Sequence, residues 1–438
     1  MITIFSKYVL QNVLAMVGIS VYILADTFFI SMYAGADGLA VLNLILPLYG
    51  LIYAIGAMIG IGSATGFSIK NARKERTDFH FSQSVLWSLI ASVPFMVLGL
   101  FFPDNVLSLL GADEGLILLG GQYIQIILLA APLFMVNYTF TAFLRNDYAP
   151  KTAMVASIAA SLFNVVFDYI LMFPLGLGFV GAALATALSP IVTMLICSTH
   201  FFKAENHFVL KWQLPTIHRL IAACRFGIPA FVGEISGAIT TITFNILILA
   251  IAGNIGVAAY GVIANIALVV MAIFNGIAQG SQPLISENYG RGNKKALKQL
   301  LTLGISTSLI FMVVILAILR GWTDAFIAVF NRDANSELAS YAFTGMRIYF
   351  LGFLFASVNI FLVSYFAATN NGIIAFVGSI LRGAIAIILC AVILSTIFGM
   401  TGVWLSFITS EFITFIVIID LFQRTKNRNP RKKIHLES

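Results

Sequence analysis

The feature that most constrains this chain is its series of long, almost uninterrupted apolar runs. An α-helix needs about 20 such residues to cross the hydrocarbon core of a bilayer. The chain has little means of covering a hydrated surface, because only 10% of its 438 residues are charged and 60% are hydrophobic. A soluble domain carries roughly 25% charged residues. The sequence therefore predicts an all-α integral membrane protein whose main solvent is lipid.

Twelve of these runs are candidate transmembrane helices. They cover residues 8–33, 39–69, 81–103, 117–144, 152–174, 179–202, 226–251, 257–288, 299–320, 339–368, 375–398 and 401–422. Several are longer than the roughly 20 residues that a span requires, so we expect them to tilt, to kink or to extend beyond the bilayer. Since the number of spans is even, both ends of the chain are expected on the same side of the membrane.

Lysine and arginine residues are distributed very unequally between the two sides. Of the 25, 21 lie in the loops of one side or in the C-terminal tail, Arg145 among them. Arg320 and Arg332 lie on the other side, and Arg347 and Arg382 lie within spans. Basic loops remain in the cytoplasm, so we expect a multi-pass plasma-membrane protein with both termini in the cytoplasm. The same bias explains the net charge of +7 without a nucleic-acid partner.

The second half of the chain repeats the first. A shift of 218 residues aligns small residues around the first two spans, and a shift of 221 aligns two glycines further along. The first shift brings Gly35, Gly38, Ala40, Gly62, Ser63 and Ser68 onto Gly253, Gly256, Ala258, Gly280, Ser281 and Ser286, and the second brings Gly178 and Gly181 onto Gly399 and Gly402. Such internal symmetry is the signature of a repeat architecture.

Each copy of the repeat contains six spans, so both copies enter the membrane from the same side. We therefore expect two six-helix lobes related by pseudo-twofold symmetry along the membrane normal, with a substrate site between them, as in one class of secondary transporters. The N-terminal lobe is predicted over 1–215, and the C-terminal lobe, with its basic cytoplasmic tail, over 216–438.

Glu287 and Asp420 lie near the cytoplasmic ends of their spans and need no special role. Four other acidic residues lie deeper within predicted spans, where each costs about 3 kcal/mol to insert. They are Asp26, Asp168, Glu234 and Glu411. At about 1.5 Å of rise per residue, Asp26 and Asp168 both lie about 10 Å below the outer surface. Residues with such a cost usually mark an ion or substrate route.

Polar residues accompany the two outer acids at similar depth. Tyr22 is one helical turn from Asp26, Asn164 is one turn from Asp168, and Thr186 lies at a comparable depth in the next span. These side chains form either an oxygen cage for a hard cation or a pair of carboxyl groups that share a proton. Alternatively, Asn164 and Thr186 only hydrogen-bond helices together.

The repeat assigns this acidic pair to the first half alone. Phe244 stands at the position equivalent to Asp26, and the equivalents of Asp168 fall within Leu389–Ala391. Glu234, near mid-depth, is expected either to face the central cavity or to pair with Arg382 or Arg347. Glu411 and Arg382 are expected to neutralise each other.

The run IGAMIGIGSATG is rich in glycine but is not a phosphate-binding loop, because no strand precedes it. Gly56, Gly60, Gly62 and Gly66 instead indicate close packing or bending of helices within the membrane.

Several segments resemble the multidrug and toxic compound extrusion (MATE) family, especially its bacterial DinF-like branch, in order along nearly the whole chain. They read LADTFFISMYAG, NVVFDYILMFPLGLGFVGAALATALS, GSQPLISENYGRGN, SILRG and FGMTGVW. The second of these is the most specific. The resemblance implies a bacterial cytoplasmic-membrane protein, a coupling ion in place of a cofactor, and a monomer.

The resemblance also implies roles for individual residues. Asp26, Asn164, Asp168 and Thr186 fall where the family has its N-lobe cation site, which is a metal site if Na⁺ is the coupling ion. Tyr22 falls beside it. Tyr22, Asp26, Asp168 and Glu234 are the expected substrate-binding residues. Glu234 resembles an acid found in another branch, whose further aspartate has no counterpart within 339–368, so a C-lobe ion site is not expected.

The leading hypothesis is a multidrug efflux antiporter that exports small organic cations in exchange for Na⁺ or H⁺ by alternating access, with membrane lipid as its surroundings. A lipid-linked oligosaccharide flippase of the same superfamily is the alternative, but it requires a strongly basic cavity. An intramembrane aspartyl protease lacks its GxGD motif here, so an enzyme is not expected. A channel is a further alternative, but two lobes with an acid site in only one suit alternating access better.

Overall fold

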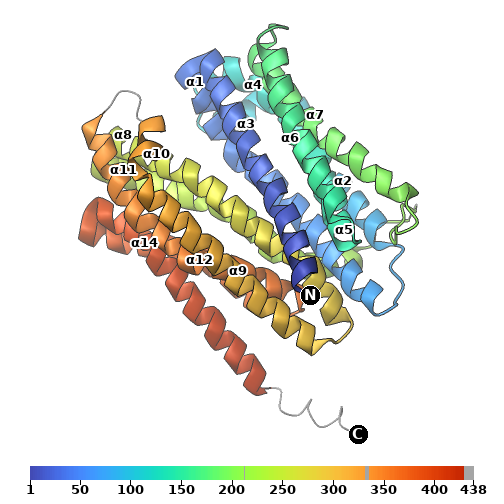
Figure 1. The fold of residues 1–438 in the computed structure, drawn as a ribbon. Coiled ribbons are helices and arrows are strands. Elements are labelled where there is room, and N and C mark those ends of the chain that lie inside the picture. Colours follow the sequence, from blue (N-terminus) through green and yellow to red (C-terminus); the bar gives the residue numbers. More distant parts are fainter. Residues whose placement is uncertain (212, 331–334, 429–438) are drawn as a thin grey trace. The chain divides into compact units, whose positions relative to one another are not determined.

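The computed structural model describes residues 1–211, 213–330 and 335–428, which lie almost entirely in helices (Figure 1). Within those ranges there is no strand, in agreement with the all-α prediction. Arg332 and the basic residues that follow Arg428 lie outside the described residues.

The helices follow one another with short connections. The first part of the chain forms α1 (Ile2–Ala72), α2 (His80–Phe101), α3 (Pro103–Leu109), α4 (Glu114–Leu129), α5 (Ala131–Asn146), α6 (Pro150–Met172), α7 (Gly178–Ser198), the 3₁₀ turn η1 (Thr199–Phe202) and α8 (Ile217–Gly290). The second part forms α9 (Lys294–Gly321), α10 (Thr323–Phe330), α11 (Ser336–Tyr349), η2 (Phe350–Gly352), α12 (Phe353–Ala368), α13 (Gly372–Ile380), the π-helix η3 (Leu381–Ile385) and α14 (Ala386–Arg428).

Long apolar helices account for the predicted spans. In the described part of the chain, nine helices are long and apolar enough to cross a membrane, and α1 already counts as two of them. Gly253 and Gly399 divide two others, and α4 with α5 forms one further span bent by 44°. Counted in this way the spans number twelve, as predicted.

Prolines explain where the structure departs from the predicted span limits. The span predicted over 81–103 ends at Phe101, because Pro103 cannot continue the hydrogen-bond ladder and instead begins α3. The span predicted over 117–144 bends after Ala130, beside Pro132 at the start of α5. The short helices α3 and α10 were not predicted from the sequence.

The internal repeat is visible in the backbone. Gly35 and Gly253, 218 residues apart, interrupt α1 and α8 with φ angles of 57° and 60°. Gly178 and Gly399, 221 residues apart, have similar φ angles of 52° and 57°. Glycine adopts this region of φ without the steric cost that a side chain would add. Two of the glycine pairs that the repeat aligns therefore share their backbone conformation.

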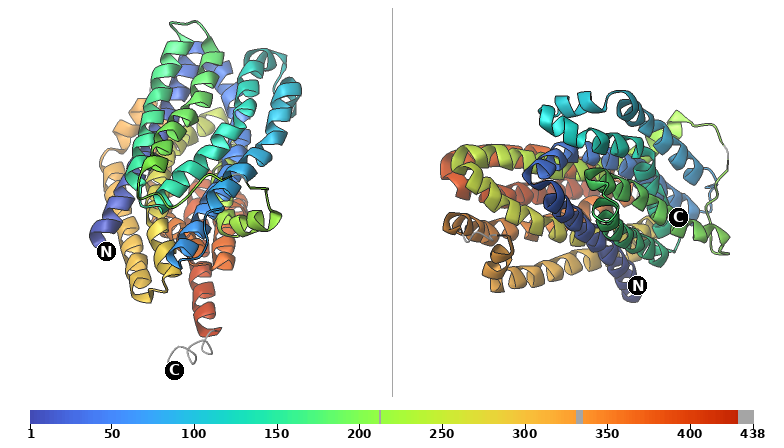
Figure 2. Two further views of the ribbon diagram at one scale, coloured as in Figure 1. Left: turned by 90° about the vertical axis from the view of Figure 1, so that its right-hand side faces the viewer. Right: turned by 90° about the horizontal axis from the view of Figure 1, so that it is seen from above.

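The chain divides into two compact units. The first comprises Met1–Ala238 and Asn275–Leu300, and the second comprises Ile239–Phe274 and Leu301–Ser438. In the first unit, α6 lies against α7, and α1 lies against α5 and α6 (Figure 2). The boundary of the two predicted lobes at residue 215 stays a prediction.

Glycines allow two helices of the first unit to cross with their backbones in contact. A Cβ added to Gly62 would overlap the carbonyl group of Ala223 in α8, and one added to Gly227 would overlap the carbonyl oxygen of Met58 in α1. A Cβ added to Gly60 would lie 2.8 Å from the carbonyl carbon of Tyr138 in α5. The expected packing role of this glycine-rich run is confirmed.

The connector between α7 and α8 is hydrogen-bonded to the start of α2. Ser82 and Gln83, at the start of α2, hydrogen-bond four backbone groups of this connector. These groups are Val209 O, Lys211 N, Leu214 O and Thr216 N, at 2.8–3.2 Å. Asp78 pairs with Arg76 and Lys211, and the hydrogen bond from Arg76 lowers the pKa of Asp78.

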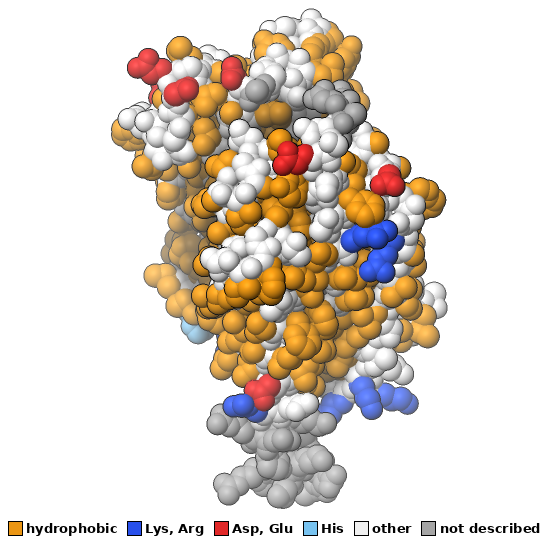
Figure 3. All heavy atoms as spheres, turned by 90° about the vertical axis from the view of Figure 1, so that its left-hand side faces the viewer, with side chains coloured by type: hydrophobic (Ala, Val, Ile, Leu, Met, Phe, Trp, Pro, Cys, Tyr) orange, Lys and Arg blue, Asp and Glu red, His pale blue; other side chains and the backbone are white. Residues whose placement is uncertain are grey.

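Hydrophobic side chains dominate the surface, as shown for one face in Figure 3. Large apolar side chains are exposed along several spans, among them Phe101, Leu162, Ile246 and Ile310, each at least 62% exposed. Soluble monomeric proteins rarely expose apolar surface of this extent to water. The chain is a multi-pass membrane protein.

Candidate functional site

Three of the predicted site residues form one hydrogen-bonded set in the first unit. Asn164 and Asp168 lie one turn apart on α6 and are fully buried, and Thr186 faces them from α7. The Asn164 amide lies 3.2 Å from Thr186 Oγ1. With its nitrogen turned toward the carboxylate, Asn164 donates to Asp168 Oδ2 at 3.2 Å and accepts from Thr186.

Asp26 brings a second buried carboxyl group from α1. It is 8% exposed, and its charge interacts with that of Asp168. Asp26 Oδ1 and Asp168 Oδ1 are both buried without a hydrogen-bond partner among the described residues. Two unsatisfied carboxylate oxygens in a buried site are costly unless a proton or a cation compensates them.

Small residues bring the helices of this set together. A Cβ on Gly181 of α7 would lie 2.7 Å from the carbonyl carbon of Leu171 near the end of α6. Gly18 of α1 faces Ile158 and Ser161 of α6 at ordinary van der Waals distance. Since residues four apart lie on one helix face, this approach directs Asn164 and Asp168 toward Thr186.

A group of tyrosines adjoins the acids. Tyr22 lies within electrostatic reach of Asp26 and Asp168, and its hydroxyl faces that of Tyr53. The ring of Tyr53 in turn contacts that of Tyr138, with centroids 6.0 Å apart. Tyr53 and Tyr138 were not singled out from the sequence, although a hydroxyl within an apolar span was a usable signal.

Glu234 joins this group through Tyr138. The Tyr138 hydroxyl donates to Glu234 Oε1 at 3.0 Å, so α5 and α8 each contribute one partner. Of the two basic partners considered from the sequence, Arg382 is paired with Glu411, and the guanidinium of Arg347 lies over the ring of Phe343 at 4.5 Å. Glu234 thus has a phenol as its hydrogen-bond partner within the first unit.

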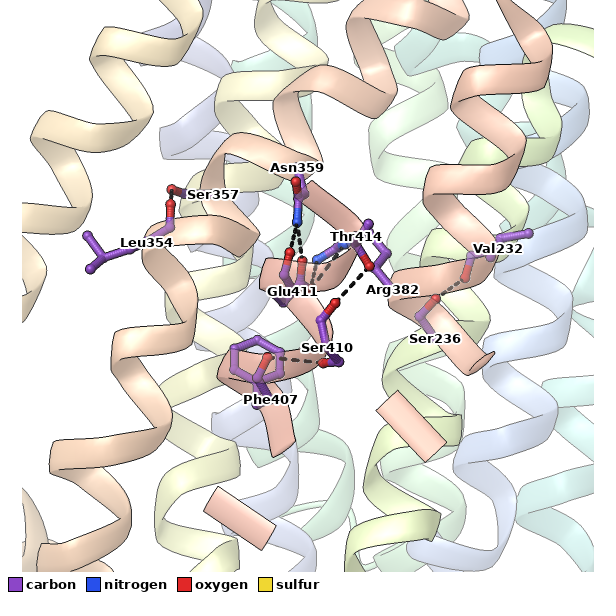
Figure 4. Close-up of polar contacts among 10 residues, drawn as sticks. All are labelled: Val232, Ser236, Leu354, Ser357, Asn359, Arg382, Phe407, Ser410, Glu411 and Thr414. Carbon is purple, nitrogen blue, oxygen red and sulfur yellow. Dashed lines mark hydrogen bonds and ion pairs between the residues drawn. The ribbon is translucent and has the colours of Figure 1, made fainter. Parts of the chain in front are cut away.

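The second unit contains a buried ion pair (Figure 4). Arg382 donates to Glu411 Oε1 at 3.0 Å, and Asn359 Nδ2 donates to Glu411 Oε2 at 2.8 Å. The predicted mutual neutralisation of Glu411 and Arg382 is confirmed. Arg382 lies in the π-helix η3, a local widening of the helix that is common at functional sites.

The oxygen atoms of the first unit's set suit a hard monovalent cation or a proton. Asp26, Asp168, Asn164 and Thr186 offer two carboxylates, an amide and a hydroxyl, which are the donor types that hard cations bind. Among the residues that the structure describes, no cluster of three or more histidine, cysteine or acidic side chains is arranged to hold a metal.

Comparison with known proteins assigns this chain to a family. The family model MatE matches residues 12–170 and 229–393, which together make up most of the chain. The chain belongs to the MATE family. This membership confirms the predicted transporter class, as opposed to an enzyme; assignment to the DinF-like branch stays a prediction.

Curated relatives and solved structures extend over nearly the whole MATE chain. It is 27% identical to the multidrug export protein MepA of Staphylococcus saprophyticus, covering 90% of this chain and 87% of the relative. It is 28% identical to MepA of Staphylococcus aureus strain MSSA476, covering 89% of this chain and 86% of that relative. The outward-facing structure of a multidrug resistance MATE transporter superposes with a TM-score of 0.88 at 22% identity, covering 96% of both chains.

A further structure, of a Vibrio cholerae MATE transporter variant, gives a TM-score of 0.89 at 18% identity and covers 98% of this chain and 97% of its own. At such low identities the likeness concerns the fold alone. It confirms the predicted MATE architecture of twelve helices in two lobes.

Proposed function

We propose that this MATE protein exports small organic cations from the cell in exchange for Na⁺ or H⁺, by alternating access. Two lines of support meet here. Relatives that align with about 90% of the chain are named multidrug export proteins. The first unit also holds two buried, interacting carboxyl groups, each with an unpartnered oxygen. This acid pair is the observation that carries the proposal.

In this account, Asp26, Asn164, Asp168 and Thr186 bind the coupling ion. Asn164 orients Asp168 by donating to Oδ2, and Thr186 fixes the amide of Asn164. When Na⁺ or a proton is bound, the negative charge of the pair falls. Tyr22, Asp26, Asp168 and Glu234 are assigned to cargo, because acids and aromatic faces attract organic cations.

Coupling follows if ion and cargo oppose each other at this site. A ligand shifts a conformational equilibrium only through its different affinities for the two states. Loading of the acid pair from outside weakens its attraction for a bound organic cation, so cargo is released. The coupling ion then leaves on the cytoplasmic side, and the cycle restarts.

We also propose that the protein lies in a bacterial inner membrane, with both termini on its cytoplasmic side. The distribution of lysine and arginine residues, 21 of 25 on one side, supports this orientation. In it, Asp26 and Asp168 lie in the outer half of the membrane, within reach of an imposed ion gradient.

Transport in liposomes tests the proposal. Purified protein is reconstituted, and uptake or release of ethidium is followed under a Na⁺ gradient and, separately, a pH gradient. We expect one gradient to drive accumulation against the dye gradient. No driven movement under either gradient, together with translocation of a pyrophosphate-linked oligosaccharide lipid, would favour the flippase instead.

A further inference from the structure

Two cationic side chains from different helices converge on one aromatic ring of the first unit. Lys70 Nζ lies 5.2 Å from the ring centroid of Phe79, and the guanidinium carbon of Arg219 lies 4.0 Å from the same centroid. Lys70 is in the last turn of α1, Phe79 immediately precedes α2, and Arg219 is in the first turn of α8. All three side chains are half-buried, and the coupling site uses none of them.

The acidic residues that adjoin this cluster in the sequence are paired with other bases. Those pairs join Glu75 to Arg73, and Asp78 to both Arg76 and Lys211. In the part of the chain that the structure describes, neither Lys70 nor Arg219 forms an ion pair with a carboxylate. Arg219 donates to the amide oxygen of Gln213 at 2.7 Å, which positions the guanidinium without neutralising it. The cluster therefore carries two positive charges and no compensating anion.

These charges lie at the ends of membrane spans. One span ends at Ala72, just after Lys70, and the next begins at His80, directly after Phe79. In the proposed orientation this is the cytoplasmic side. Basic residues between spans on that side are suited to the headgroups of anionic lipids, because the inner leaflet is negatively charged. Half-buried stems with cationic ends are also the usual arrangement of lysine and arginine at this depth.

Exposed apolar side chains accompany the cluster along the connector and the start of α8. Leu214 is 80% exposed, Ile217 is 67% exposed and Ile221 is 62% exposed. Ile217 and Ile221 lie on one face of α8, because they are four residues apart. Arg219, between them in sequence, instead contacts the ring of Phe79. An apolar face combined with basic residues is typical of a segment that lies in the membrane interface.

We propose that Lys70 and Arg219 bind the phosphate of an anionic phospholipid in the inner leaflet, with its acyl chains against Leu214, Ile217 and Ile221. The planar fork of donors on arginine matches phosphate, and lysine contributes a point charge on a flexible stem. The lipid supplies the anion that the two cations lack. It thereby joins the end of α1 to the start of α8 and stabilises the first unit. This site does not depend on the proposed export function.

Native mass spectrometry of the full-length protein tests the site directly. Protein in detergent is titrated with dioleoyl phosphatidylglycerol or dioleoyl phosphatidylcholine, which share their acyl chains and differ in net charge. We expect the unmodified protein to bind its first phosphatidylglycerol more tightly. Lys70→Gln and Arg219→Gln should each weaken this binding by roughly fivefold, as expected for one basic residue at an anionic surface. Binding of phosphatidylcholine should stay within about twofold.

Two double variants serve as controls. Lys70→Arg with Arg219→Lys keeps both positive charges and should retain the preference for phosphatidylglycerol. Lys151→Gln with Lys294→Gln removes two charges from exposed positions at the starts of α6 and α9, and should leave both affinities unchanged. Equal affinity of the unmodified protein for the two lipids would overturn the proposal. An undiminished preference in Lys70→Gln with Arg219→Gln would overturn it as well.

Glycerol 3-phosphate distinguishes a lipid site from a site for soluble phosphates, because it has a phosphate headgroup but no acyl chains. Phosphatidylglycerol should raise the melting temperature of the unmodified protein in detergent, and should raise that of Lys70→Gln with Arg219→Gln less. Glycerol 3-phosphate at the same concentration should raise neither. Equal increases with the two ligands in the unmodified protein would contradict a lipid site and assign the two cations to a soluble phosphate.

Discussion

At the scale of single residues, coupling depends on charges placed where lipid and protein exclude water. Asp26 and Asp168 are buried, interact, and keep one unpartnered oxygen each. Replacement of either by asparagine preserves shape but removes the titratable and ion-binding group. We expect Asp26→Asn and Asp168→Asn to abolish gradient-driven export while expression remains normal.

The matched control for these variants is Asp37→Asn, which removes an exposed acid that follows the kink of α1. It should export at the unmodified rate. Dye accumulation in everted vesicles, normalised to protein amount by immunoblot, provides the measurement. Full activity in both acid variants would eliminate the acid pair as the coupling site.

A second residue-scale prediction concerns the phenol that holds Glu234. Tyr138→Phe removes the 3.0 Å hydrogen bond to Glu234 Oε1 and leaves the ring in place. Since such a bond contributes about 0.5–1.5 kcal/mol, affinity for a cationic dye should change roughly two- to tenfold. Tyr169→Phe, at a residue that is 53% exposed, should have no effect. Identical affinities in all three proteins would exclude Glu234 and Tyr138 from cargo binding.

At the scale of helices, glycines determine which backbones can touch. Gly227→Ala places a methyl group on the carbonyl oxygen of Met58, whereas a Cβ added to Gly233 in the same helix meets no atom within 4 Å. Gly227→Ala should therefore lower the melting temperature and the yield of monodisperse protein. Gly233→Ala should be neutral or slightly stabilising, because alanine favours helix by about 1 kcal/mol over glycine. Equal behaviour would show that the crossing tolerates separation.

A separate prediction concerns the kinks of α1 and α8. Gly35 and Gly253 have φ near 60° and no atom within 4 Å of an added Cβ, so alanine there adds backbone strain without a clash. We expect Gly35→Ala and Gly253→Ala each to cost about 1–3 kcal/mol, lowering the melting temperature by similar amounts. Gly50→Ala, at an open helical position, is the control. Different losses of melting temperature in the two kink variants would mean that the two repeats do not depend equally on a glycine at the kink.

The helices and their repeat could be predicted from the sequence because both follow from local patterns: apolar length, and glycines at a constant spacing. The interruptions before Pro103 and at Ala130 were harder, since apolar composition continues through them. The partner of Glu234 could not be predicted, because it depends on which faces of α5 and α8 meet. Asn164 and Asp168 were found because a turn of helix separates them.

At the scale of the whole molecule, orientation is testable directly. A cysteine at position 430, in the part of the tail outside the described residues, should remain unlabelled by an impermeant maleimide in intact cells. A cysteine at Glu114, an exposed position that begins α4, should be labelled. Labelling of the tail from outside would reverse the proposed topology and, with it, the side from which ions load.

The central claim is that the coupling ion and the cationic cargo compete through Asp26 and Asp168. Equilibrium binding of the cationic dye tetramethylrhodamine methyl ester to purified protein, titrated against pH and against Na⁺, tests it most directly. We predict that affinity falls as pH drops or as Na⁺ rises, and that Asp26→Asn loses this dependence. Affinity that is flat in the unmodified protein under both titrations would contradict the account.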